Sequence, residues 1–75
     1  MERNLKFTVG DKVKVIATKE QLKEIGIGET WDDELFNEEI YVENLVVERI
    51  NKDKYLPYLL NNGFFFSEVC LDYAD

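Results

Sequence analysis

The sequence contains no histidine and only one cysteine, Cys70, among its 75 residues. A single cysteine cannot form a disulfide within one chain, and the missing histidines remove the usual ligands of a zinc site. The same absence excludes a nucleophile paired with a histidine base. We therefore predict a protein that is not an enzyme, has no catalytic residues and binds no metal or cofactor.

Long apolar runs are also missing. No window approaches the roughly 18 apolar residues that a membrane span needs, and Met1 to Lys6 lacks the apolar stretch of a signal peptide. No loop fits a phosphate, because Gly26-Ile27-Gly28 is short and no strand leads into it. Together with the unpaired cysteine, these absences predict a cytoplasmic protein without membrane contact.

The chain does contain enough large apolar side chains for a core. Hydrophobic residues make up 45% of it, including one tryptophan, four tyrosines and five phenylalanines. A chain of this length buries only about 60% of its unfolded surface and has room for one core. We expect a single domain over residues 1–75.

Acidic residues are concentrated in one part of the chain, which we call the acidic segment, residues 29–48. It carries eight of the sixteen acids and none of the nine bases, within a net charge of −7. Two carboxylates about 6 Å apart in water repel by roughly 0.7 kcal/mol, which a surface tolerates and an interior does not. We expect these side chains in water: Glu29, Asp32, Asp33, Glu34, Glu38, Glu39, Glu43 and Glu48.

The first half of the chain predicts one strand and two short helices. Residues 12–15 alternate lysine and valine, which is typical of a half-buried strand. Thr18 to Gln21 has the form of a capping box, and Gly26 follows where the helix would stop. Thr30 can cap a second helix with acids in its first turn. A long irregular loop is the alternative for this second segment.

The second half predicts strands and a hairpin. Residues 40–50 are β-formers centred on Leu45 to Val47, a turn follows at 51–54, and residues 55–60 form the next strand. Asn62-Gly63 between apolar runs predicts a two-residue hairpin turn with Leu60 opposite Phe65. Phe65 then lies on the other face from Phe64 and Phe66, so at least one ring is a candidate for exposure. Ser67 is expected to cap a short helical turn that leads into a final strand through Tyr73.

This order of parts resembles an SH3-like barrel, in particular the small versions encoded by phages and prophages of Gram-positive bacteria. The resemblance implies a mainly β, five-stranded small barrel with one or two short helices in the long loop after the first strand; an α+β fold is the alternative. Many of these proteins have no assigned role. The motifs of peptide-binding SH3 domains are missing, so proline-rich peptide binding is not implied. The Gly10-Asp11 start is also similar to KOW-type modules, but those are usually basic.

The leading functional hypothesis is a phage- or prophage-encoded protein-binding module that docks its acidic segment on a basic protein surface. Mimicry of DNA phosphates, and so inhibition of a DNA-binding protein, is one version. Carboxylates would steer the encounter, and two aromatic residues would hold the complex. The candidate binding residues are Trp31, Asp32, Asp33, Glu34, Phe36, Glu38 and Glu39. Alternatively, Trp31 simply anchors the loop on the barrel.

Two other functions stay open. The chain is alternatively a structural or self-associating domain of a phage assembly, with the aromatic hairpin as its contact surface. It is otherwise a weak nucleic-acid-binding module that uses Lys6, Lys12 and Lys14, although these lysines also suit the wet face of a strand. The acids at 32–34 and 38–39 do not have the spacing of a calcium loop, so no metal site is predicted.

Overall fold

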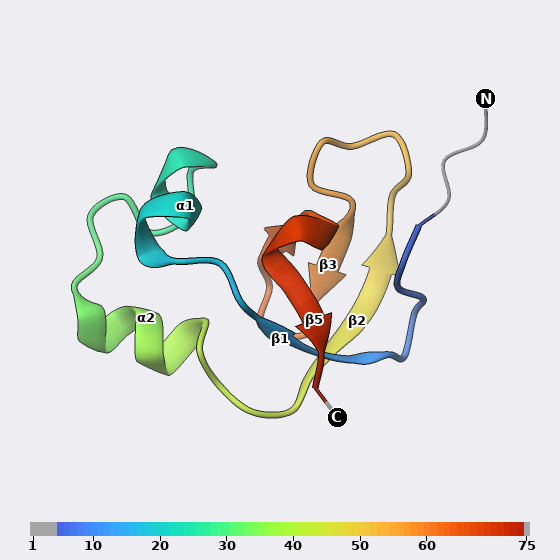
Figure 1. Cartoon of the computed structure of the whole chain (residues 1–75), viewed down its shortest axis with the longest axis horizontal. Helices are drawn as coiled ribbons and strands as arrows, with labels where there is room; N and C mark the ends of the chain where they lie inside the picture. Colours follow the sequence, from blue (N-terminus) through green and yellow to red (C-terminus); the bar gives the residue numbers. More distant parts are fainter. Residues whose placement is uncertain (1–4, 75) are drawn as a thin grey trace.

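The computed structural model describes residues 5–74 and contains five antiparallel strands in one sheet, in the order β4-β3-β2-β1-β5 (Figure 1). The strands are β1 (Lys12–Val15), β2 (Leu45–Ile50), β3 (Tyr58–Leu60), β4 (Phe65–Phe66) and β5 (Leu71–Tyr73). Two helices, α1 (Lys19–Glu24) and α2 (Asp33–Glu39), lie in the connection after β1, and the 3₁₀ turn η1 (Glu68–Cys70) precedes β5. The mainly β prediction is confirmed. The sheet is open, and closure into a barrel stays a prediction.

The predicted alternation of β1 is confirmed. Val13 and Val15 are buried, whereas Lys12 and Lys14 are exposed. β1 pairs with β2 on one side and with β5 on the other, so the first and last strands of the chain lie side by side at one edge of the sheet. The period of two in the sequence therefore places the apolar face of β1 on the core.

Helix α1 begins and ends where the sequence predicts. The Thr18 side chain accepts from the Gln21 amide at 3.2 Å, and the Gln21 side chain accepts from the Thr18 amide at 2.8 Å. Gly26, just after the helix, has a φ of +93°, a conformation that favours glycine. The single buried residue of α1 is Leu22, which ties this short helix to the core.

Helix α2 is present, but the prediction that Thr30 caps it is wrong. Asp32 is the N-cap, and its Oδ1 accepts from the Leu35 amide at 2.9 Å. Thr30 instead lies in a turn closed by the Trp31 amide, which donates to the Gly28 carbonyl at 3.1 Å. A carboxylate accepts an amide proton more strongly than a hydroxyl, so the aspartate is the better cap at the helix N-terminus.

The hairpin forms with a different register from the predicted one. Leu59 pairs with Phe65 and Tyr58 with Phe66, and the Leu60 amide donates to the Phe64 carbonyl at 3.1 Å. The loop thus has three residues and ends at Gly63, whose φ is +88°. The predicted register would have placed buried Leu60 on the same face as Phe65, whose exposed fraction is 45%. Burial of the apolar face decides the register.

Two element boundaries and one predicted cap also differ from the sequence prediction. Strand β2 begins only at Leu45, after Asn44 with a φ of +67°. Strand β3 begins at Tyr58, so Tyr55 belongs to the β2–β3 loop. Ser67 stands at the start of η1, but its side chain makes no capping hydrogen bond. The hydroxyl instead lies 3.6 Å from the Cys70 sulfur.

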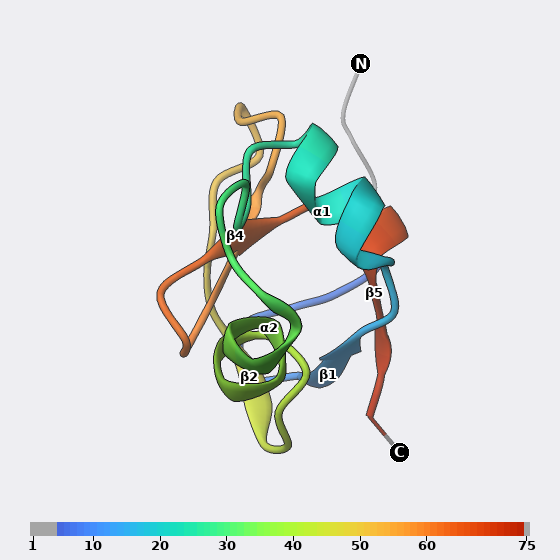
Figure 2. The same ribbon diagram turned by 90° about the vertical axis from the view of Figure 1, so that its left-hand side faces the viewer.

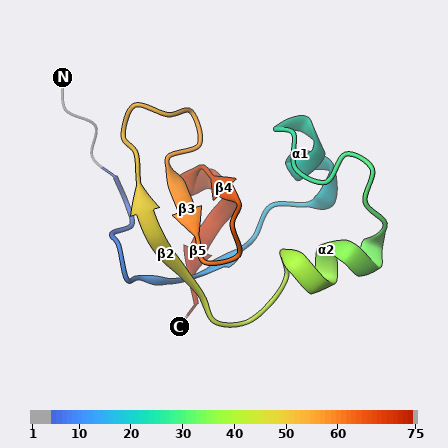
Figure 3. The same cartoon turned by 180° about the vertical axis from the view of Figure 1, so that it is seen from behind.

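The core combines side chains from the sheet and from the helical connection. Figures 1 and 3 show both helices beside one end of the sheet, and Figure 2 views them from that side. The fully buried residues include two from the helices, Leu22 and Phe36, together with Ile40 just after α2. They pack against buried residues of the strands and the N-terminal segment: Phe7, Val13, Val47, Tyr58, Leu60, Phe66 and Leu71.

Candidate functional site

The carboxylates of the acidic segment lie at the surface, as predicted. All eight of its carboxylate residues are exposed, and most belong to α2 or its flanks. Apolar residues of the same segment point inward, since Phe36, Ile40, Leu45 and Val47 are buried. The segment therefore separates its apolar side chains from its charges, as an amphipathic element does.

The charges at the C-terminal end of α2 are not explained by helix stability. Asp33 and Glu34 lie in the first turn, where the positive end of the helix dipole favours carboxylates. Glu38 and Glu39 lie in the last turn, which contains no base. A carboxylate there faces the negative end of the dipole and costs about 0.3–1 kcal/mol. Helix stability therefore gives no reason for acids at these two positions, whereas binding to a partner gives one.

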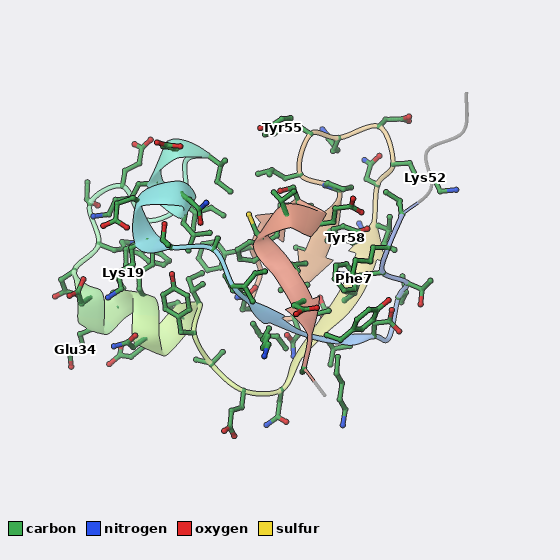
Figure 4. The ribbon with its side chains drawn as sticks, in the orientation of Figure 1. Phe7, Lys19, Glu34, Lys52, Tyr55 and Tyr58 are labelled. Carbon is green, nitrogen blue, oxygen red and sulfur yellow. The ribbon has the colours of Figure 1, made fainter. Side chains whose placement is uncertain are left out.

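A single salt bridge in the described part of the chain involves the acidic segment. Lys19 Nζ lies 3.1 Å from Asp33 Oδ1 and joins α1 to α2 (Figure 4). The Asp33 side chain remains 83% exposed, so water screens this pair and it contributes only about 0–1 kcal/mol. Within residues 5–74, salt bridges thus involve one of the eight carboxylates of the segment.

The two aromatic candidates, Trp31 and Phe36, do not form an exposed contact surface. Phe36 is 0% exposed and belongs to the core, so it cannot touch a partner in this structure. Trp31 is partly buried, with its ring 5.3 Å from Phe36 and 5.3 Å from Phe64 in edge-to-face geometry. These contacts match the anchoring interpretation of Trp31. The structure therefore brings the acids together without a large exposed ring among them.

Exposed apolar side chains lie elsewhere. Phe65 is among them, as the alternation of the hairpin residues predicts, whereas no sequence pattern singled out Tyr55 or Val69. Tyr55 is 80% exposed, Val69 79% and Phe65 45% (Figure 4 shows Tyr55 on the β2–β3 loop). Tyr55 borders two hollows. One, of about 330 Å³, is lined by Lys54, Leu56 and Phe65, and the other, of about 200 Å³, lies between Tyr55, α1 and η1. The residues of both hollows are called the Tyr55 groove below. Tyr55 was missed because its apolar neighbours suggested a strand.

The lysines of the nucleic-acid alternative are interleaved with carboxylates, since Asp72 pairs with Lys14 across β1 and β5 and bridges Lys6. Lys12 and Lys14 border a hollow of about 340 Å³ that they share with Glu43 and Asn44. Lys6 forms a salt bridge with Asp72 at 3.6 Å and lies over the rings of Phe7 and Tyr73. The carboxylates of Glu43 and Asp72 therefore offset part of the positive charge that would have to attract phosphates.

Two further features concern metals and membranes. The potential metal ligands in residues 5–74 form no group of three or more. Neither α1 nor α2 has the length or the apolar character that crossing a bilayer requires.

Comparison of the chain with models of known protein families, with curated proteins and with solved structures found no match. The function therefore has to be argued from the residues themselves.

Proposed function

We propose that the chain is a non-enzymatic protein-binding module that docks its acidic segment on a basic protein surface. The observation that carries this proposal is the exposure of all eight carboxylates of residues 29–48, with one salt bridge among them. So dense a field of one sign raises the rate of encounter with a positively charged partner. The same field lowers the stability of the unbound protein, because like charges repel.

The class of module is proposed to be an SH3-like small barrel. Three features support it: the strand order, the long connection after β1 and the 3₁₀ turn before the last strand. A phage or prophage origin fits the same resemblance. In this architecture the connection after β1 lies outside the sheet and can carry a binding surface without disturbing the strands. Figure 1 shows α2 beside the sheet, which agrees with this role.

A basic DNA-binding protein is one partner of the proposed kind, which would make the chain an inhibitor by phosphate mimicry. The sequential acids at 32–34 and 38–39 lie on a helix and its cap, so their charges follow a curved surface rather than a loose loop. A DNA-binding surface is selected to meet fixed negative charges. The proposal therefore predicts that DNA and this protein compete for such a partner.

The test captures partners from bacterial lysate and then titrates each purified partner at low and high salt. The variant Glu34→Gln with Glu38→Gln removes two charges of the segment. Glu20→Gln with Asp53→Asn removes two exposed charges outside it and serves as the control. We expect the first pair to weaken binding about 10-fold and the control less than about 2-fold.

Two results would contradict the proposal. The first is a partner whose affinity does not fall with salt. The second is equal weakening by both pairs of substitutions, since a general effect of net charge would then suffice.

A further inference from the structure

We propose that the Tyr55 groove is a second contact surface, which binds an extended segment of the partner with a large apolar side chain next to a basic one. The inference deepens the proposed function, because it rests on the protein being a binding module. It also supplies the apolar anchor that the acidic segment lacks, since Phe36 is buried and Trp31 is packed on the core.

Ala17 and Cys70 at the floor of the groove belong to the core, but its two most exposed apolar residues do not. Tyr55 and Val69 are about four-fifths exposed, and neither packs against the core cluster. A polar side chain at either position would cost the folded protein little. A tyrosine ring held at a loop tip offers a large contact area with few rotatable bonds, which suits a binding hot spot. The groove is thus built for contact with something outside the chain.

The shape of the groove indicates an extended occupant. Tyr55 lines both hollows, so one extended peptide that crosses this residue can contact both. Alternate side chains of an extended peptide are about 7 Å apart and point the same way. One such side chain would enter the first hollow and a neighbour the second. Tyr55 of the β2–β3 loop lines the second hollow together with Gln21 and Glu24 of α1, as this arrangement needs.

The charge and polarity of the two hollows differ and indicate which side chain each accepts. The first is lined by Lys54, Tyr55, Leu56 and Phe65, and the surface that these residues present to it is mostly apolar. It suits a large aliphatic or aromatic side chain. The second carries the Glu24 carboxylate, with Gln21 and Ser67 as further polar groups. Because the chain as a whole carries a charge of −7, a basic side chain is the complementary occupant.

The experiment uses a library of random twelve-residue peptides displayed on filamentous phage, selected on the full chain. Selected peptides are then synthesised and titrated, and their contacts are mapped by amide chemical shifts. We expect enrichment of a large apolar residue with lysine or arginine within about two positions of it. Shift changes are expected in α1, in the β2–β3 loop and in η1.

Matched variants assign the binding to the groove. Tyr55→Ala is expected to weaken the selected peptides about 10-fold, and Val69→Ser to weaken them by a smaller factor. Val9→Ser is the control, because Val9 is 61% exposed and lies outside the groove. Glu24→Gln should reduce the preference for the basic residue, whereas Glu20→Gln, on the same helix, should not. All five positions are exposed, so the variants should keep the fold.

The inference is overturned if no peptide is enriched, if the enriched peptides are acidic, or if Tyr55→Ala binds them as well as the unmodified chain does. The two sets of variants distinguish a failure of this inference from a failure of the proposed function. Partners lost on Glu34→Gln with Glu38→Gln but unaffected by Tyr55→Ala would remove the groove and leave the acidic docking surface. The reverse pattern would remove the acidic surface and leave the groove.

Discussion

The sheet and the helical connection between β1 and β2 are held together by different means. The strands share main-chain hydrogen bonds along four pairs, from β4 at one edge to β5 at the other. In residues 17–43 no main-chain to main-chain hydrogen bond reaches a strand. Side chains connect this segment to the sheet instead. Phe36 and Leu22 enter the core, and Trp31 packs on Phe64. Asn62 Nδ2 donates to the Glu39 carbonyl at 3.0 Å.

Because of this difference, the outward-facing side chains of the connection can change without altering the pairing of the strands. A ladder of main-chain bonds tolerates many side chains, whereas a segment held by a few buried rings depends on each of them. The acids of α2 are free to point outward because those rings point inward. Three substitutions test the comparison, from the largest expected effect to the smallest.

Phe36→Ala removes the ring that holds α2 to the core. Because Phe36 is 0% exposed, we expect the free energy of unfolding to fall by about 3–5 kcal/mol. Urea unfolding measures the loss, and hydrogen exchange should show α1 and α2 losing protection before the strands do. Phe65→Ala, at a half-exposed ring on the sheet, is the control and should cost much less. Equal costs for the two substitutions would contradict the dependence of the connection on buried rings.

Gly28→Ala tests the close approach of rings to the chain before α2. An added Cβ would lie 2.6 Å from Phe36 Cζ and 2.8 Å from Trp31 Cε3, and φ at Gly28 is +69°. The left-handed backbone costs an alanine about 1–2 kcal/mol, and displacing two rings adds about 1–3 kcal/mol.

Gly26→Ala provides the matched control for this substitution. Gly26 also has a positive φ, of +93°, but nothing lies within 4 Å of the added Cβ. Thermal or urea unfolding of both variants therefore isolates the contribution of the rings. If Gly26→Ala costs as much as Gly28→Ala, ring packing makes no contribution at this position.

Tyr41→Phe removes a hydrogen bond within the connection. The Tyr41 hydroxyl donates to the Ala17 carbonyl at 2.7 Å, and its loss should cost about 0.5–1.5 kcal/mol. Tyr55→Phe is the control, because Tyr55 is 80% exposed, and it should change the free energy of unfolding by less than about 0.5 kcal/mol.

The same hydroxyl predicts a pH dependence. Burial, opposed in part by Lys19, raises the pKa of Tyr41 above its ordinary value of 10.0. The unfolded chain therefore loses the proton first, so this contribution to stability is complete below about pH 10 and declines as the pH rises toward the raised pKa. Unfolding curves in alkali should show this decline in the unmodified chain and in Tyr55→Phe, but less of it in Tyr41→Phe. A steeper decline in Tyr41→Phe would contradict the direction of the shift.

Part of the candidate site could be predicted from the sequence. The exposure of the eight acids follows from the cost of burying charge, and it holds at every position of residues 29–48. The roles of the aromatic residues could not be predicted. The sequence groups Phe36 with the acids as a candidate for an exposed binding residue, yet it is fully buried, whereas Tyr55, in a predicted strand, is 80% exposed. Only the neighbours that a ring meets across the fold decide between these outcomes.

Local chemistry alone determined the valine face of β1, the capping box of α1 and the charge of α2, because each depends on residues within a few positions of one another. Tertiary structure decided the hairpin register, the inward position of Phe36 and the outward position of Tyr55. In each of these, the free energy comes from apolar surface removed from water between segments far apart in the chain. This free energy cannot be predicted from a short window of sequence, because it depends on which distant segments come into contact.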